Sequence, residues 1–276
     1  MLINFTKMHG LGNDFMVIDT IKQAITLSPT QIQKLSDRHF GVGFDQLLLV
    51  EKPNNPKNDF KYRIFNADGS EVEQCGNGAR CFARFVIKKE LTDKRIEQSI
   101  SVETKKGIIE LLVIDFDTVV VNMGEPLWHS KDIPFRQLKS TNATYIVEEK
   151  TVGVVSMGNP HAVLIVDDIN QEIAPTAQRI QNSPDFPEGV NVNFVEIVDQ
   201  FNLKLRVYER GVGETLACGS GACATVAYLD KIGKVNAGLN VIVELQGGKL
   251  LVRFDDDKNI IMSGAAEFVF EGQVEI

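Results

Sequence analysis

The sequence predicts an α+β protein of two similar domains, in each of which a sheet wraps around one central helix. Three observations predict this fold: landmarks that recur in the same order, apolar helices that follow glycine-rich turns, and runs in which Val, Ile and Leu alternate with polar residues as in half-buried strands. With 276 residues, the chain is long enough for two domains. We expect an N-terminal domain at 1–121, completed by a return segment at 265–276, and a C-terminal domain at 122–264.

The first two landmarks are short glycine-containing motifs that precede apolar runs. Gly-Asn-Asp-Phe at 12–15 returns as Gly-Asn-Pro-His at 158–161, and the segment Gly41–Glu51 returns as Gly189–Val198. The second copies lie about 146 residues after the first. A nearly constant offset indicates an internal duplication.

The third and fourth landmarks contain the cysteines and further strands. A strand-like run leads to Cys-Gly-Asn-Gly-Ala at 75–79, and a similar run leads to Cys-Gly-Ser-Gly-Ala at 218–222. Alternating apolar and polar residues follow at 99–124 and again at 239–264, which is typical of half-buried strands. All four landmarks therefore occur twice in one order.

Each cysteine turn is followed by an apolar helix. The first is expected from Ala79 to about Lys89, because apolar residues recur there at helical spacing and form a wide arc. The second is expected from Ala222 to about Leu229. Helices this apolar must be nearly enclosed, so we place one at the centre of each domain.

The charge and the cysteine count narrow the function classes. A formal net charge of −8 argues against nucleic acid or an anionic membrane surface as a partner, because both need clustered Lys and Arg. No apolar stretch approaches the ~18 residues of a membrane span, and the N-terminus lacks a signal-peptide pattern, so we expect a cytoplasmic protein. Four cysteines in a chain this long are expected to remain thiols there.

A cysteine followed by Gly-x-Gly and a helix lies at the helix N-terminus, where unpaired N–H groups and the helix dipole favour negative charge. We therefore expect a lowered thiol pKa at Cys75 and Cys218. The glycines also let backbone amides hold a substrate carboxylate. With one turn on each domain, a small amino acid between them would have a sulfur on each face of its Cα. One thiolate would remove the α-proton while the opposite thiol delivered another.

Other interpretations of the cysteines and glycines are weaker. Cys81 and Cys223 lie inside apolar helices, and we expect them to be packing residues. A zinc site would use all four cysteines, but the spacings Cys-x5-Cys and Cys-x4-Cys fit structural zinc poorly, and we expect no metal. The phosphate-loop pattern and the dinucleotide fingerprint are both absent.

Five segments together resemble the diaminopimelate epimerase family, over a match that extends from Gly10 to about Gly264. They are Phe-Asn-Ala-Asp-Gly-Ser at 65–70, Cys-Gly-Asn-Gly-Ala-Arg at 75–80, Gly-Asn-Pro-His at 158–161, Tyr-Glu-Arg-Gly at 208–211 and Cys-Gly-Ser-Gly-Ala at 218–222. The resemblance implies two pseudo-symmetric domains, each a mostly antiparallel, barrel-like sheet around a central helix. It also implies conversion of LL-diaminopimelate to the meso form, for lysine and peptidoglycan synthesis, without pyridoxal phosphate or metal.

The resemblance also assigns roles to individual residues. Cys75 and Cys218 match the acid and base pair, and His161 and Glu209 match positions that poise the two thiols. The turns that bind the reacting carboxylate match Gly76, Asn77, Gly219 and Ser220. The positions that recognise the rest of the substrate match Asn13, Gln46, Asn66, Asn159, Asn191, Glu209 and Arg210.

Simpler roles remain open for some of these residues. His161 could be a structural histidine, and Asn13 and Asn66 could be turn residues that tolerate a left-handed backbone. Asn193 departs from the family pattern, because relatives often have glycine at that position.

Alternative functions also remain open. A proline racemase-like enzyme would use two cysteines but would not need the Glu209-Arg210 pair or the asparagines. A non-catalytic amino-acid-binding protein would not need both thiols, and a thiol-redox protein would cycle them through a disulfide. The sequence does not fix the oligomeric state, and we carry a homodimer as the expectation.

Overall fold

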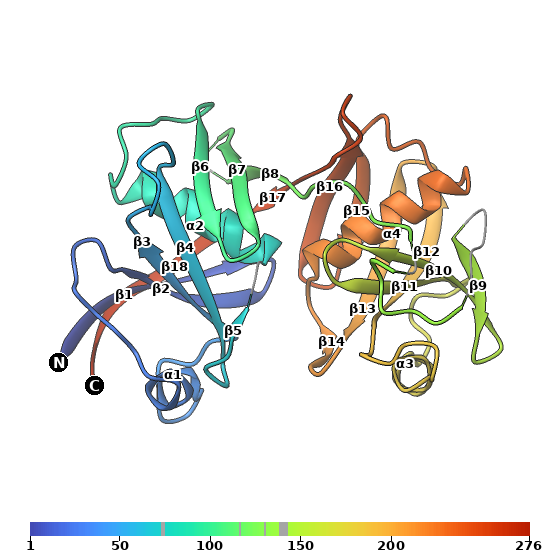
Figure 1. The fold of residues 1–276 in the computed structure, drawn as a ribbon, viewed down its shortest axis with the longest axis horizontal. Helices are drawn as coiled ribbons and strands as arrows, with labels where there is room; N and C mark the ends of the chain where they lie inside the picture. The colour runs from blue at the N-terminus through green and yellow to red at the C-terminus, as the bar shows by residue number, and fades with distance from the viewer. Residues whose placement is uncertain (73–74, 116, 130, 138–142) are drawn as a thin grey trace. The chain divides into compact units, whose positions relative to one another are not determined.

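The chain forms two compact units. Unit 1 comprises Met1–Val121 and Ser263–Ile276, and unit 2 comprises Asn122–Met262. The computed structural model describes residues 1–72, 75–115, 117–129, 131–137 and 143–276. Each unit contains one long helix packed on its strands (Figure 1).

Unit 1 is a sheet in which neighbours are mostly antiparallel. Its strands are β1 (Leu2–Gly10), β2 (Asn13–Asp19), β3 (Gln46–Glu51), β4 (Phe60–Asn66), β5 (Glu71–Val72), β6 (Ser99–Thr104), β7 (Gly107–Val113), β8 (Thr118–Asn122) and β18 (Glu267–Glu275). They pair in the order β18-β1-β2-β3-β4-β6-β7-β8, and β5 adds to β4. The β2–β3 and β4–β6 pairs are parallel.

Unit 2 repeats this pattern of pairing. Its strands are β9 (Thr144–Val147), β10 (Lys150–Ser156), β11 (Pro160–Ile165), β12 (Asn191–Asp199), β13 (Asn202–Glu209), β14 (Gly213–Thr215), β15 (Val241–Leu245), β16 (Gly248–Phe254) and β17 (Ile260–Ala265), the last of which crosses into unit 1. They pair in the order β9-β10-β11-β12-β13-β15-β16, and β14 adds to β13. As in unit 1, the third and fifth pairs in this order, β11–β12 and β13–β15, are parallel. The predicted α+β fold with two similar sheets is confirmed.

The final strand of each repeat pairs with the first strand of the other repeat. β9 is the final strand of the first repeat, but it pairs antiparallel with β10, the first strand of the second repeat. β18 is the final strand of the second repeat, but it pairs antiparallel with β1 over almost its whole length, from Leu2 opposite Glu275 to His9 opposite Glu267. Each unit is therefore completed by a strand from outside its own repeat.

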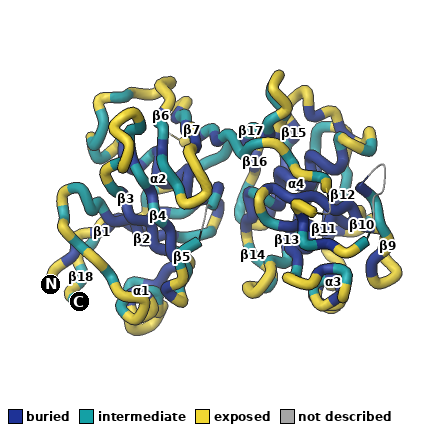
Figure 2. The backbone as a smooth tube through the Cα atoms, in the orientation of Figure 1, coloured by how far each residue is buried: buried dark blue, intermediate teal, exposed yellow. Residues whose placement is uncertain are grey.

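The central helices are α2 (Gly76–Lys88) and α4 (Gly219–Lys231), which are buried along most of their length (Figure 2). Both begin three residues earlier than the apolar spacing predicts. The reason is that each cysteine is the N-cap residue in an extended backbone, and its carbonyl already accepts the N–H of the residue four positions on. Enclosure by the sheet outweighs the low helix propensity of the glycines.

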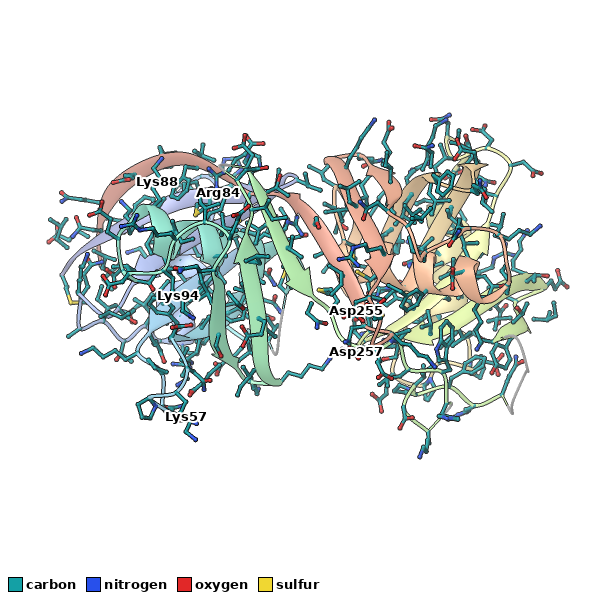
Figure 3. All side chains as sticks on the ribbon, turned by 90° about the horizontal axis from the view of Figure 1, so that it is seen from above. Lys57, Arg84, Lys88, Lys94, Asp255 and Asp257 are labelled. Atoms are coloured by element: carbon teal, nitrogen blue, oxygen red, sulfur yellow. The ribbon has the colours of Figure 1, made fainter. Side chains whose placement is uncertain are left out.

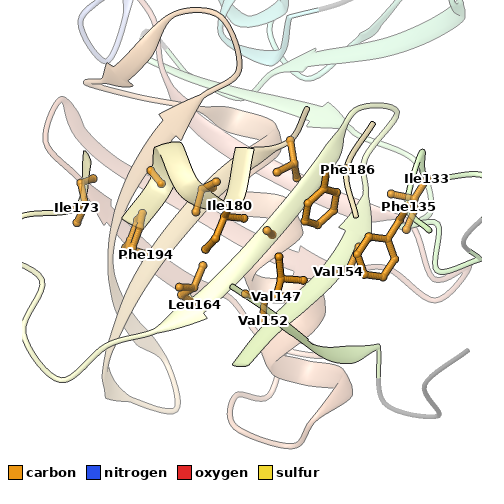
Figure 4. Packing of buried hydrophobic residues seen from close by; sticks show 14 of the residues in the cluster. Ile133, Phe135, Val147, Val152, Val154, Leu164, Ile173, Ile180, Phe186 and Phe194 are labelled. Carbon is orange, nitrogen blue, oxygen red and sulfur yellow. The ribbon is translucent and has the colours of Figure 1, made fainter. Parts of the chain in front are cut away.

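Two shorter helices cover the outer faces of the sheets. α1 (Pro29–Ser36) begins at a capping box between Ser28 and Gln31, and α3 (Ala174–Gln181) buries Ala177 and Ile180. The cluster beneath α3 includes a pair of aromatic rings, Phe135 and Phe186, whose centroids lie 4.8 Å apart (Figure 4). None of the helices in the described part of the chain is long and apolar enough to cross a bilayer.

The last strand is also attached to the central helix of unit 1. Two cations on α2, Arg84 and Lys88, are labelled in Figure 3. They lie over the ring of Phe268 on β18, at 5.4 and 4.3 Å from its centroid. Arg84 also donates to the carbonyl of Ala266. The C-terminal strand is thus an integral part of unit 1.

Candidate active site

The first cysteine turn lies between strand β4 and the N-terminus of α2. The backbone N–H of Cys75 donates to the hydroxyl of Tyr62 at 3.0 Å, which joins the turn to β4. Burial raises the pKa of Tyr62 above its usual range, so the phenol stays neutral. The sulfur of Cys75 lies 3.8 Å from Oδ1 of Asn13, to which the thiol can donate.

Asn13, the first residue of β2, is held in this orientation by charged neighbours. Its Nδ2 donates to the carboxylate of Asp45 at 3.0 Å, so its Oδ1 faces Cys75 and accepts from Nδ2 of Asn77 at 3.1 Å. Arg38 bridges Asp45 and Asp14. Burial alone would raise the pKa of Asp14, but hydrogen bonds from Arg38 and from buried Lys7 outweigh it and lower the pKa to about 2. Asn13 therefore rests on an ionised network.

A fully buried arginine supports the same turn from within the helix. Arg80 has no exposed surface, and its guanidinium donates to Oδ1 of Asn77 at 3.1 Å, to the carbonyl of Gly76 at 3.4 Å and to the carbonyl of Ala265 at 3.1 Å. A cation in the protein interior interacts strongly with nearby charge, because little solvent screens it. This end of α2 thus favours an anionic group.

The side chains of Gln46 and Asn66 meet across the β3–β4 pair. Nε2 of Gln46 donates to Oδ1 of Asn66 at 3.0 Å, and the two residues are direct partners in the antiparallel register. Oε1 of Gln46 is buried and has no hydrogen-bond partner among the described residues. A buried acceptor of this kind is costly unless a donor reaches it, so it suits a donor on a ligand.

The second cysteine turn has the same backbone geometry as the first. Cys218 caps α4, and its sulfur accepts the N–H of Gly221 at 3.4 Å and lies 3.5 Å from the hydroxyl of Ser220. The cysteine is 5% exposed. Here a backbone N–H donates to the sulfur and a side-chain hydroxyl lies beside it.

A buried histidine lies behind the Cys218 turn. Nε2 of His161 lies 3.1 Å from Oγ of Ser220 and 3.2 Å from Oδ1 of Asn159. Its Nδ1 lies 3.2 Å from Oδ1 of Asn193. Burial lowers the pKa of His161 to about 4, a shift that the hydrogen bond with Asn193 opposes and the charge of Arg210 reinforces. The imidazole is therefore neutral at neutral pH.

The β12–β13 edge of unit 2 positions the remaining residues. Oδ1 of Asn191 accepts the backbone N–H of Arg210 at 2.9 Å, and Glu209 accepts the hydroxyl of Thr215 at 2.6 Å. Arg210 also donates to the carbonyl of Glu188 at 2.7 Å and lines a cavity of about 470 Å³. This cavity can accept an anionic group.

The residues predicted from the sequence fall into two sets, one in each unit. In unit 1, Asn13, Gly76 and Asn77 lie at the Cys75 turn, and Gln46 and Asn66 form a separate pair. In unit 2, the Cys218 turn with Gly219 and Ser220 adjoins Asn159 and His161, while Asn191 contacts Arg210, which follows Glu209. Cys81 and Cys223 are buried in the helices as packing residues, and burial raises the pKa of Cys81 to about 12.

Sequence reasoning missed the residues that support the two turns. These are Asp45, Arg80, Asn193 and Thr225. A signal existed for two of them: Arg80 is a charged residue inside an apolar helix, and Asn193 interrupts an apolar strand. A buried position of either kind needs polar partners, which only the fold identifies.

Comparison with known proteins identifies the family of this chain. A family model described as diaminopimelate epimerase matches residues 5–129 and 153–269. The chain belongs to the diaminopimelate epimerase family. Proteins named diaminopimelate epimerase from Psychrobacter sp. (strain PRwf-1) and Psychrobacter arcticus are 51% and 49% identical to it over 279 aligned residues, covering 99% of this chain and 94% of each relative.

Solved structures with lower identity share the fold of this family member. A phenazine biosynthesis protein of the PhzF family from Bacillus anthracis superposes with a TM-score of 0.70 at 19% identity, covering 100% of both chains. A probable proline racemase from Agrobacterium radiobacter gives a TM-score of 0.71 at 14% identity, covering 99% of this chain and 93% of the other. At such identities the likeness concerns architecture alone.

Proposed function

We propose that this member of the diaminopimelate epimerase family interconverts LL- and meso-2,6-diaminopimelate, with Cys75 and Cys218 as the two proton-transfer groups. The observation that carries the proposal is that each cysteine is the N-cap residue of the central helix of its repeat. A packing cysteine would have no reason to recur at both helix N-termini, where backbone N–H groups favour an anion.

The reaction needs one base and one acid on opposite faces of the stereocentre. In one direction the first thiolate takes the α-proton, which leaves a carbanion, and the second thiol gives its proton to the opposite face. The first cysteine is then a thiol and the second a thiolate, so the pair is set for the reverse direction. All proton transfers are made by the chain's own sulfurs, and we propose a reaction independent of pyridoxal phosphate and metal.

The turns themselves suit the carboxylate next to the reacting carbon. The backbone amides of Gly76 and Asn77 open α2, and those of Gly219 and Ser220 open α4. Helix N-termini bind carboxylates through such amides, and they stabilise negative charge that spreads from the carbanion into the carboxylate.

The other predicted residues suit the distal amino and carboxyl groups. The unsatisfied Oε1 of Gln46 and the carboxylate of Glu209 are acceptors for an ammonium group. The guanidinium of Arg210 can grip a distal carboxylate in bidentate fashion. Donors and acceptors between these ends come from the side-chain amides of Asn13, Asn66, Asn159 and Asn191. A substrate with one carboxylate, such as proline, would not use the residues that bind the distal groups.

Three wider proposals follow from this role. The enzyme would act in the cytoplasm, where its thiols stay reduced, in the synthesis of lysine and of peptidoglycan precursors. We also propose that it assembles as a homodimer. Static light scattering or equilibrium sedimentation of the purified protein would test this. A monomer at working concentration would contradict that assembly without touching the chemistry.

The decisive experiment uses purified protein and LL-diaminopimelate in deuterated water without added cofactor. We expect the meso isomer to accumulate with deuterium at the inverted Cα, because the proton that arrives comes from a thiol in exchange with solvent. Proline offered in the same way should not exchange its α-proton. Exchange of proline with no turnover of diaminopimelate would instead favour the racemase function.

A further inference from the structure

Unit 2 contains a buried polar cluster that has no counterpart in unit 1. His161, Asn193 and Thr225 have no exposed surface. The strand registers and the distance from each cysteine place Phe15, Leu48 and Phe82 at the equivalent positions of unit 1, and these are equally buried. Burying polar groups costs free energy where apolar ones would fit, so a polar cluster at this site needs a reason.

The amide of Asn193 has only one orientation that satisfies its neighbours. Its Nδ2 donates to the carbonyl of Gly221 at 3.0 Å and to the hydroxyl of Thr225 at 3.1 Å, and Thr225 in turn donates to that same carbonyl. A carbonyl oxygen can only accept, so the reverse orientation would set two acceptors against each other. Oδ1 of Asn193 must therefore face Nδ1 of His161.

This orientation determines the tautomer of His161. Because Oδ1 of Asn193 is an acceptor, Nδ1 of the imidazole must carry the proton. The ring is neutral, so its Nε2 is then an acceptor for the hydroxyl of Ser220 at 3.1 Å. Oδ1 of Asn159 lies 3.2 Å from the same nitrogen and cannot donate to it, so the half-buried amide of Asn159, which is less constrained than that of Asn193, must turn its Nδ2 toward Nε2. With its proton directed to His161, the oxygen of Ser220 presents a lone pair to the sulfur of Cys218, 3.5 Å away.

We propose that Asn193 is a positioning residue that fixes His161 as the Nδ1–H tautomer and thereby directs the Ser220 hydroxyl to accept a hydrogen bond from the Cys218 thiol. The other tautomer would lose the hydrogen bond to Asn193 and would turn the Ser220 hydroxyl toward the sulfur, which would favour the thiolate. Asn193 thus sets whether Cys218 is presented as a proton donor. Its effect on turnover rests on the proposed function, whereas its effect on the tautomer does not.

The tautomer can be read directly from nitrogen chemical shifts. The protein with ¹⁵N-labelled histidine contains only four histidines, and the His161→Gln variant identifies the resonances of His161. We expect a protonated Nδ1 and an unprotonated Nε2, with no titration around neutral pH. A proton found on Nε2 of the wild-type protein would overturn the proposal even if the enzyme is a fully active epimerase.

Two variants separate positioning from packing. Asn193→Leu introduces the residue that unit 1 uses at the equivalent position, and Asn193→Ala covers the case in which leucine does not fit. In either one we expect the Nε2–H tautomer to appear. In a Cys75→Ala background, we also expect a several-fold larger ultraviolet thiolate signal from Cys218 at neutral pH.

Thr225→Val is the matched control, because it removes a buried hydroxyl but leaves the hydrogen bond from Asn193 to Gly221 in place. We expect it to keep the wild-type tautomer and thiolate signal. With the proposed activity, Asn193→Leu should lower kcat about tenfold while KM changes little, since about tenfold corresponds to one well-placed hydrogen bond. An equal effect of Thr225→Val on tautomer and kcat would assign the result to packing and would overturn the proposal.

Discussion

The two cysteine turns have the same backbone and different supports. At Cys75 the turn rests on charge: buried Arg80 holds Asn77 and Gly76, and Asp45 holds Asn13. At Cys218 the support is neutral, formed by His161 and the amide cluster behind it, and Cys223 takes the position of Arg80. Duplication has therefore kept the N-cap cysteine and the enclosed helix while the groups that set each sulfur's surroundings diverged. Two sulfurs in equal positions need not be equal acids.

The largest expected effect tests whether both turns are needed. Cys75→Ala and Cys218→Ala should each lower epimerisation by at least about a thousandfold, because each removes the proposed proton-transfer group of one face. The rate of isomer interconversion measures this loss. Cys81→Ala and Cys223→Ala are the matched controls, since both residues are buried packing groups, and should retain most activity. Native-rate exchange of the α-proton in both active-site variants would rule out the two-thiol reaction.

A second comparison concerns the buried support. Arg80→Met should lower the free energy of unfolding by about 3 kcal/mol, because three acceptors around the guanidinium lose their donor inside the protein. Cys223→Ala, at the equivalent position of unit 2, should cost about 1 kcal/mol as a small cavity. Urea unfolding monitored by circular dichroism gives both values. Equal losses would show that the charge at the first turn has no special structural role.

The smallest expected effect is a dependence of the free energy of unfolding on pH, which arises in unit 1. Because the pKa of Asp14 is lowered to about 2, its ionised form stabilises the fold above the unfolded pKa, and this contribution is lost as pH falls from about 4 through 2. Asp14→Asn should therefore be less stable than wild type by about 1 kcal/mol at neutral pH, after allowance for solvent screening. The difference should shrink toward pH 2 in urea titrations. A difference that stays constant over this range would mean that the carboxylate charge is not the cause.

Repetition within the chain made much of the fold predictable. The cysteine turns, the enclosed helices and the two similar sheets each left a signal that appears twice, and both sequence copies could be compared. The apolar spacing begins only at Ala79 and Ala222, so it predicts both helix starts three residues too late. The low helix propensity of glycine also disfavours an earlier start, but the sheet around Gly76 and Gly219 overrides it.

The supports of the turns could not be predicted in the same way. Arg80 and Asn193 differ between the two repeats, and their partners come from distant segments such as Ala265 and Thr225. A single sequence does not show which backbone carbonyls a buried side chain will reach. The roles of residues that differ between the two repeats could therefore be assigned only from the structure.

The exchange of end strands has a consequence for synthesis on the ribosome. The second repeat already has β9 when its own strands emerge, so it can complete its sheet as soon as it leaves the exit tunnel. The first repeat emerges earlier but waits for β18, and Ile276, the residue after this strand, bonds back to Met1. Until β18 has emerged, the edge of β1 is open to any extended peptide nearby. The first repeat is thus made first but completes its sheet last, and its unpaired edge is exposed during that interval.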